Sequence, residues 1–113
     1  MDARANAIAE FMDEVRSDDS STRFAAVACL GGIKAVEAIE IITSVLCDPS
    51  ADKLIRLRAV AALGEIGPPA SKVVRTVIDN YDQDYCEIYY DALQAIGTEE
   101  ALAFAESHRH RAK

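Results

Sequence analysis

The segment RLRAVAALGEI at residues 56–66 nearly repeats the segment RFAAVACLGGI at residues 23–33. The two segments start 33 residues apart, and a further step of the same length leads to YYDALQAIG, which ends at Gly97. A fixed period of this size is typical of repeat proteins, in which every copy is one supersecondary unit. The sequence therefore predicts three copies of one structural unit.

The aligned positions of the three copies keep their size and polarity. One position holds alanine in every copy, and others hold large apolar residues. Because a column of alanine lets two helix backbones approach closely, these positions belong in a shared core. Cys29 stands in the column of Ala62 and Ala95, so we expect it to be a small core residue as well. The positions that we expect to be buried are Ala26, Ala59, Ala92, Leu30, Leu63 and Ile96.

Each copy contains two apolar stretches with helical spacing, separated by a break. The first helix should end at Gly31, Gly64 or Gly97, because glycine most easily adopts the left-handed conformation that closes a helix. After this break, Pro68 suits a first helical turn and Thr98 suits an N-cap. We expect first helices at 20–31, 52–64 and 84–96, and second helices at 34–46, 69–80 and 98–110.

The N-terminal segment 2–16 matches a second helix, since Met12, Val45 and Ile78 are separated by the same period. No segment shows the period-two alternation of a β-strand. The sequence therefore predicts an all-α protein, a short right-handed α-solenoid of about seven helices in one domain. Its parts are an N-terminal half-repeat at 1–16 and repeats at 17–49, 50–82 and 83–113.

Composition limits the partners of this chain. The 113 residues include 12 basic and 19 acidic ones, and the net charge of −7 disfavours nucleic acids and anionic membrane surfaces. No apolar run reaches the roughly 20 residues that span a bilayer. The three cysteines are odd in number and lie in helical patterns, with Cys47 and Cys86 near helix ends, where we expect them to be partly exposed. We expect a cytoplasmic protein with reduced thiols and a protein partner that has a basic surface.

Residue patterns that carry catalysis or bind cofactors are missing from the sequence. It contains no Gly-rich phosphate loop, no Cys-x-x-Cys and no His-Glu-x-x-His. The two histidines, His108 and His110, point away from each other on a helix, which disfavours a metal site with Cys86. We therefore expect no catalytic residue, no metal and no cofactor.

The segment IRLRAVAALGEIG at 55–67, with its weaker copies TRFAAVACLGGI and IYYDALQAIG, resembles the HEAT-like repeat of the bilin-lyase type. The resemblance implies a non-catalytic scaffold that binds other proteins. For some members of that family it also implies the attachment or removal of bilin chromophores on phycobiliproteins. It further implies that Arg23 and Arg56 contribute to contacts between repeats. The two hypotheses are a protein-interaction scaffold and, as the alternative, a bilin lyase or phycobilisome-related factor within a larger assembly.

The third copy differs from the first two at its start. In the first copy Asp19 precedes Arg23 by four residues, a spacing typical of an exposed helical ion pair, and the second copy keeps this pattern. The third copy has two tyrosines there, among several carboxylates. Tyrosine is enriched in binding hot spots, but it also suits an amphipathic cover over the last repeat. If this surface binds a partner, its residues are Tyr81, Tyr85, Tyr89, Glu87 and Asp91.

The polar residues of the second helices form another candidate surface, which the resemblance places on the concave side. Acids of the first copy, such as Glu40, stand near bases of the second, such as Arg75. Opposite signs on neighbouring helices favour internal pairing over ligand binding, and exposed pairs contribute about 0–1 kcal/mol. Leu102 and Phe104 have little sequence after them to cover them, so we also expect weak self-association through an end repeat.

Overall fold

The computed structural model describes residues 2–111, with side chains as far as Arg109. This part of the chain is all-helical and contains no strand, which confirms the predicted short helical solenoid. Residues 2–111 form seven α-helices and three short 3₁₀ segments, one before each of α3, α5 and α6. The α-helices are α1 (Ala3–Glu14), α2 (Ser20–Gly32), α3 (Ile39–Leu46), α4 (Lys53–Ile66), α5 (Val74–Asp79), α6 (Cys86–Ile96) and α7 (Glu99–Arg111), and the 3₁₀ segments are η1 (Val36–Ala38), η2 (Pro68–Val73) and η3 (Gln83–Tyr85).

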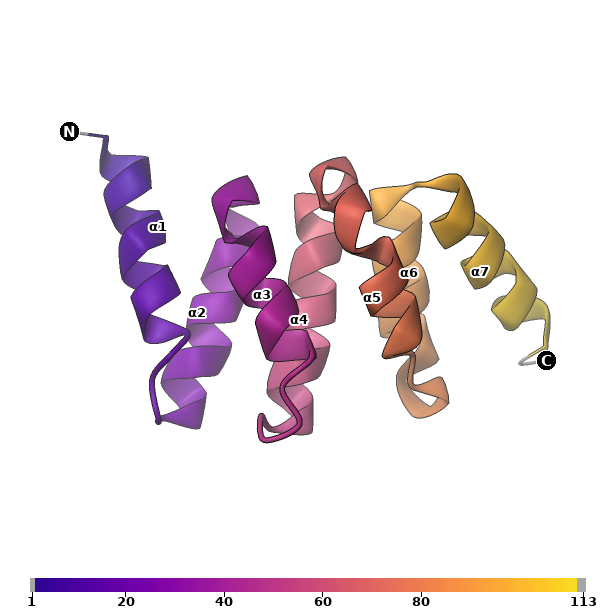
Figure 1. Ribbon diagram of the computed structural model, residues 1–113, viewed down its shortest axis with the longest axis horizontal. Coiled ribbons are helices and arrows are strands. Elements are labelled where there is room, and N and C mark those ends of the chain that lie inside the picture. Colours follow the sequence, from indigo (N-terminus) through magenta and orange to yellow (C-terminus); the bar gives the residue numbers. More distant parts are fainter. Residues whose placement is uncertain (1, 112–113) are drawn as a thin grey trace.

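The helices form two layers that run along the long axis of the molecule (Figure 1). The first helices of the repeats, α2, α4 and α6, make one layer, and α1, α3, α5 and α7 make the other. The two ends of the chain lie at opposite ends of the stack, whose extents are 47 × 28 × 17 Å. Each repeat therefore contacts only its neighbours, as expected for a solenoid.

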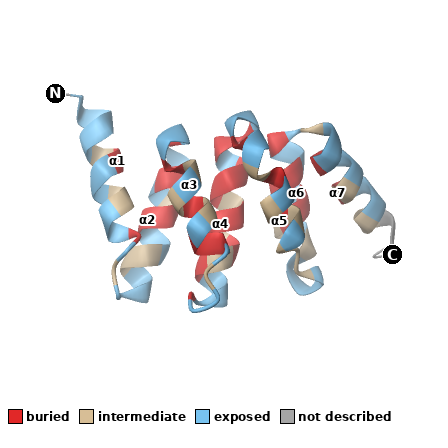
Figure 2. Cartoon of the chain, viewed as in Figure 1, coloured by how far each residue is buried: buried red, intermediate tan, exposed pale blue. Residues whose placement is uncertain are grey.

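The core lies between the two layers and is widest in the middle of the stack (Figure 2). All six positions that the repeat columns predict to be buried are buried. Leu30 and Leu63 are completely enclosed, and the alanines Ala26 and Ala59 of the same helices are buried as well. The helical periodicity of the sequence thus identified the core face of each first helix correctly.

Two of the three glycines that we expected to close a helix do something else. Gly31 and Gly64 lie inside α2 and α4. A Cβ atom on Gly31 would lie 2.8 Å from the Cα atom of Ala62, and one on Gly64 would lie 2.6 Å from the Cα atom of Ala92. Both glycines therefore allow the first helices of adjacent repeats to touch. The prediction that they cap their helices is wrong, because a neighbouring helix decides their role.

The positive φ angles that follow the first helices occur further along the chain. They belong to Lys34 (φ 55°), Gly67 (φ 82°) and Gly97 (φ 79°). From the first repeat to the second this position advances by 33 residues, but from the second to the third it advances by only 30. The helix α6 has 11 residues whereas α4 has 14. The helices α4 and α6 start 33 residues apart, but α6 ends three residues earlier than this step predicts.

Cys29 is exposed, so the prediction that it is a core residue is wrong. Its equivalent, Ala62, is buried because it faces the preceding first helix at Gly31. Within residues 2–111 the only helix before α2 is α1, which belongs to the other layer (Figure 1), so Cys29 has no first helix beside it in this structure. Cys47 is exposed and Cys86 is partly buried, as expected for residues near helix ends.

The starts of the helices follow the local sequence signals. The Thr98 hydroxyl accepts a hydrogen bond from the amide of Ala101 at 3.0 Å, which makes Thr98 the predicted N-cap of α7. Pro68 begins η2, where a missing amide proton costs no hydrogen bond. The second helices of the first two repeats differ from expectation in one respect, because each begins as a 3₁₀ turn before it becomes α-helical.

Candidate interaction surfaces

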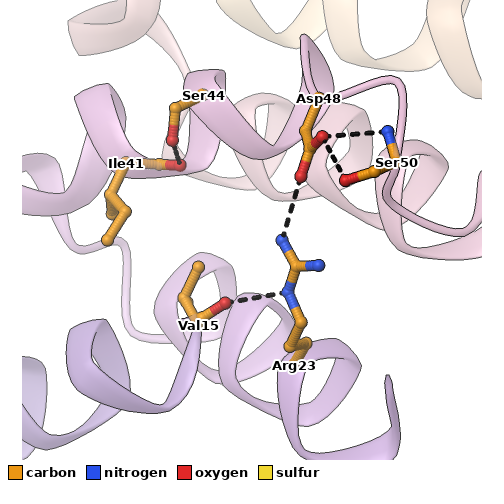
Figure 3. A network of polar contacts seen from close by, with 6 residues as sticks. All are labelled: Val15, Arg23, Ile41, Ser44, Asp48 and Ser50. Atoms are coloured by element: carbon orange, nitrogen blue, oxygen red, sulfur yellow. Dashed lines mark hydrogen bonds and ion pairs between the residues drawn. The ribbon is translucent and has the colours of Figure 1, made fainter. Parts of the chain in front are cut away.

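Arg23 connects three segments at the start of the first repeat (Figure 3). Its Nε atom donates a hydrogen bond to the carbonyl oxygen of Val15, the C-cap residue of α1, at 2.9 Å. Its Nη2 atom lies 3.7 Å from a carboxylate oxygen of Asp48. The other oxygen of Asp48 accepts from the amide and the hydroxyl of Ser50, and these bonds, followed by the charge of Arg23, hold the pKa of Asp48 below its usual value. Arg23 thus contacts elements on both sides of it, as the resemblance implied.

The ion pair that we expected between Asp19 and Arg23 does not form. The carboxylate of Asp19 instead accepts hydrogen bonds from the amide and the hydroxyl of Thr22, at 3.0 and 2.6 Å. These bonds from Thr22 lower the pKa of Asp19. Asp19 is the N-cap of α2, and the spacing of four residues arises from capping rather than from a salt bridge.

Tyr89 takes the place of Arg23 in the last repeat. Its hydroxyl donates a hydrogen bond at 2.7 Å to the carbonyl oxygen of Asn80, the C-cap residue of α5. Arg23 donates the equivalent hydrogen bond to the carbonyl oxygen of Val15, the C-cap residue of α1. Arg56 is the equivalent residue of the middle repeat. Together with Tyr89 it lines a small cavity of about 50 Å³. An aromatic residue in the third copy therefore supplies the contact between repeats that an arginine supplies in the first.

Tyr89 and its neighbours form an aromatic cluster that covers the C-terminal end of the core. The hydroxyls of Tyr81 and Tyr90 lie 2.8 Å apart, and the ring of Tyr81 also meets Phe104 edge-on, with ring centres 5.1 Å apart. His108 stacks on Phe104 at 3.8 Å. Burial raises the pKa of Tyr89, and burial with the bond to Tyr90 raises the pKa of Tyr81.

These contacts change the interpretation of the tyrosine-rich segment. Tyr89 is only 3% exposed and Tyr90 is also buried, so the expectation that Tyr89 lies on an exposed surface is wrong. Tyr81 is partly buried in the cluster. Tyr85 is the most exposed of the four tyrosines, at 37%, and the ammonium of Lys53 lies 5.3 Å from its ring centre. The alternative that we left open, a cover over the last repeat, describes Tyr81 and Tyr89 correctly.

One acid of the last repeat, Asp91, lines a groove between α4 and α6. Most residues that line it are small and apolar, Ile88 is a larger apolar one, and Glu65 and Asp91 are the two acids among them. Glu87 and Asp91 of α6 are exposed, and the Nη2 atom of Arg109 lies 3.8 and 3.9 Å from their carboxylates. The groove measures about 350 Å³, and its lining residues are Ala61, Gly64, Glu65, Ile88, Asp91, Ala92 and Ala95. Sequence reasoning identified Asp91 but not Glu65, because the repeat pattern alone does not show which helices enclose a groove.

The second helices carry both internal ion pairs and a groove. Arg4 pairs with Glu37 at 2.8 Å, and Arg75 pairs with Glu100 at 2.6 Å. Both pairs join neighbouring helices, but neither joins an acid of the first copy to a base of the second, which was the pairing that the alternation of signs favoured. Glu40 is exposed and lines a groove of about 330 Å³ between α3 and η2, and among residues 2–109 no cation lies within ion-pair distance of it. The remaining lining residues of that groove are Val36, Glu37, Ile39, Pro69, Lys72 and Val73.

The helix α7 carries one histidine that packs in the aromatic cluster and one leucine that is exposed. His108 is partly buried in the aromatic cluster, where its Nδ1 atom lies 3.0 Å from the carbonyl oxygen of Phe104, while the side chain of His110 lies outside the described residues. Within residues 2–109, no three His, Cys, Asp or Glu side chains are grouped so that they could hold a metal ion. Phe104 is partly covered by Tyr81, and Leu102 is exposed.

Comparison with known proteins places this architecture in a family. The profile of a family described as HEAT repeats matches residues 8–88, which is most of the chain. No curated protein and no solved structure matches this chain. None of the described helices has the length and apolar composition needed to cross a bilayer. HEAT repeats in general suggest a scaffold for protein interactions, and this chain belongs to the HEAT-repeat family.

Proposed function

We propose that this chain is a non-catalytic protein-interaction scaffold, and that the groove between α4 and α6 binds a basic segment of a partner protein. The observation that carries this proposal is the combination of an apolar floor with carboxylates beside it. The net charge of −7 gives the whole molecule a negative field that favours the approach of a basic partner.

The floor of the groove suits the long side chains of lysine and arginine. Ala61, Ala92 and Ala95 leave space above the helix backbones, so aliphatic stems can lie against them. A lysine or arginine buries its stem on an apolar surface while its charged head stays close to water or to an acid. Glu65 and Asp91 provide acids at this groove.

The acids of α6 are held only loosely by the chain itself. Glu87 and Asp91 share one cation, Arg109, at distances near the upper limit for an ion pair. Exposed pairs of this kind contribute about 0–1 kcal/mol. A partner can therefore replace Arg109 at little cost. Glu65 is different, because it already pairs with Arg58 at 2.7 Å. We expect the α6 side of the groove to contribute more to recognition.

Neutralisation of the α6 acids tests this proposal. The double variant Glu87→Gln with Asp91→Asn should capture at least about tenfold less partner from native cell extract, which corresponds to about 1.4 kcal/mol. The matched control is Asp79→Asn with Glu106→Gln, which removes the same charge from exposed positions on α5 and α7. Quantitative mass spectrometry of the captured proteins provides the measurement. Equal loss in both variants would show that only net charge matters and would contradict a site at the groove.

The groove of the second helices is a second candidate surface for the same function. Val36 is 48% exposed beside it, and Glu40 lines it. Arg75, which we expected to act with Glu40, already pairs with Glu100, so it contributes less to our proposal. Glu40→Gln should reduce partner capture if this groove is used, while the α6 double variant should then behave like the native chain.

The bilin-lyase role implied by the sequence resemblance is the alternative function. It predicts that the purified chain, or its assembly, changes the visible absorbance of an added bilin. The scaffold proposal predicts an unchanged bilin spectrum together with a retained protein partner. A cytoplasmic location and the absence of nucleic-acid binding are further parts of the proposal, and they rest on the composition and charge of the chain.

A further inference from the structure

Among residues 2–109, the most exposed of the large apolar side chains lies near the N-terminal end of α4, away from the groove of the proposed function. Leu54 is 67% exposed and Phe24 of α2 is 40% exposed. Both line a groove of about 300 Å³ between the first turns of α2 and α4. The other residues of this lining are Ser20, Ser21, Asp52 and Ile55. An exposed pair of large apolar side chains beside a groove is typical of a contact surface.

The repeat itself does not require an apolar residue at this position. The 33-residue step aligns Leu54 with Ser21 in the first copy and with Glu87 in the third, and both of these are exposed polar residues. Position 54 is also the second residue of α4, where a polar side chain would suit the helix start equally well. Neither the core nor the helix start therefore explains a leucine that is exposed to water.

The acids around this groove have no counterion within the part of the chain whose side chains the structure describes. Asp52 lines the groove, and Asp18 and Asp19 directly precede its first lining residue, Ser20. Among residues 2–109, no cation lies within ion-pair distance of any of these three carboxylates. The nearest lysine in sequence, Lys53, pairs with Asp82 at 3.1 Å. The acids of α6, in contrast, share Arg109.

We infer that Phe24 and Leu54 form a second docking surface, which takes a segment of a partner protein that presents an apolar side chain between lysines or arginines. The apolar side chain fills the groove beside Phe24 and Leu54. The cations meet Asp52 on one side and Asp18 with Asp19 on the other. This surface is separate from the α4–α6 groove, so the two can be tested independently.

A designed peptide probes this surface directly. The probe is a spin-labelled amphipathic helix of leucine and lysine, added to the isotopically labelled full chain. We expect its label to broaden the amide signals of residues 20–24 and 52–55 most strongly. Leu54→Ser should weaken binding about tenfold, the scale expected for one apolar side chain leaving a contact. Because Leu54 is mostly in water, this variant should melt close to the native temperature.

Matched controls separate this surface from unspecific attraction. Leu102→Ser removes an exposed leucine from α7 and should leave binding within about twofold of native, as expected for a surface change outside the contact. The Glu87→Gln and Asp91→Asn double variant should keep the broadening at 20–24 and 52–55. A peptide with glutamate in place of lysine should bind much more weakly.

Three outcomes would overturn the inference. If Leu54→Ser and Leu102→Ser weaken binding equally, the peptide binds by general attraction. If the broadening centres on residues 61–65 and 88–95 and Leu54→Ser has no effect, the groove of the proposed function is the only site. If light scattering shows a dimer that Leu54→Ser dissociates, the occupant of this surface is a second copy of the chain.

Discussion

The first and last repeats make the same hydrogen bond to the preceding helix with different side chains. In each, a residue of the first helix donates a hydrogen bond to the C-terminal carbonyl of the preceding second helix. The first repeat uses the guanidinium of Arg23, whose side chain is 20% exposed and also reaches Asp48. The last repeat uses the phenol of Tyr89, which is buried in an aromatic cluster.

The difference reflects where each repeat lies in the stack. Arg23 needs water and an acid nearby, because a guanidinium is costly to bury without a partner. A phenol keeps the hydrogen bond and adds apolar area, which suits a repeat whose outer side is covered by only one more helix. The last repeat also has no glycine at the position where Gly31 and Gly64 lie against the next first helix. Gln94 takes the position of Gly64 when the closing glycines Gly67 and Gly97 are aligned, and it is exposed.

Truncation of Arg23 and Tyr89 to alanine should show the largest difference in stability between the two repeats. Tyr89→Ala should lower the free energy of unfolding by about 3–5 kcal/mol, because it removes a buried aromatic ring and leaves a cavity. Arg23→Ala should cost about 1 kcal/mol, the usual contribution of one hydrogen bond. Urea denaturation of both variants measures the difference. Equal losses would show that the first repeat depends on Arg23 as strongly as the last depends on Tyr89.

Addition of a methyl group to the glycines tests whether the layer of first helices is closely packed. Gly31→Ala and Gly64→Ala should each cost about 1–3 kcal/mol, because a Cβ atom would overlap the backbone of the adjacent helix. Gly32→Ala is the matched control, since nothing lies within 4 Å of its added Cβ atom. That variant should gain up to about 1 kcal/mol from the higher helix propensity of alanine. A neutral Gly64→Ala would contradict the close approach of α4 and α6.

Removal of only the hydrogen-bonding groups compares the two bonds more finely. Tyr89→Phe should cost about 1 kcal/mol, because the carbonyl of Asn80 loses its donor while the ring stays in place. Arg23→Met keeps the aliphatic stem and should cost about the same. Thermal melts at neutral pH are sufficient to measure both. A Tyr89→Phe variant as stable as the native chain would show that packing alone fixes this tyrosine.

The two repeats should also respond to opposite extremes of pH. Burial raises the pKa of Tyr89 above its usual 10.0, so its contribution is complete below pH 10 and is lost as the pH rises through the folded-state pKa. Asp48 has a pKa lowered from 3.8 by Ser50 and then by Arg23, so its contribution is present above about pH 4 and is lost as the pH falls through the folded-state pKa.

Melting temperatures measured across both pH ranges check this difference. Tyr89→Phe should remove part of the alkaline dependence and leave the acid limb unchanged. Asp48→Asn should do the reverse. If each variant changed both limbs equally, the pH dependence would have to come from groups other than these two.

The repeat, the six buried positions of the first helices and the N-cap of α7 could all be predicted from the amino-acid sequence. The spacing of Leu30, Leu63 and Ile96 was sufficient to place the core, because a helix shows its buried face in its own periodicity. Thr98 was recognisable as an N-cap for a similar reason, since capping involves only residues of the same turn.

The role of each repeated position, in contrast, depends on how the helices pack against one another. Gly64 and Gly97 share a column, yet one lies against Ala92 inside a helix and the other closes a helix. Cys29 is exposed and Ala62 is buried because only Ala62 has a preceding first helix beside it. The exposure of Leu54 and the burial of Tyr89 likewise depend on neighbouring helices and on the end of the stack. The periodicity of a sequence shows which face of a helix is apolar. Whether a residue on that face is buried, and which groups it bonds to, depends on the other helices that pack against it.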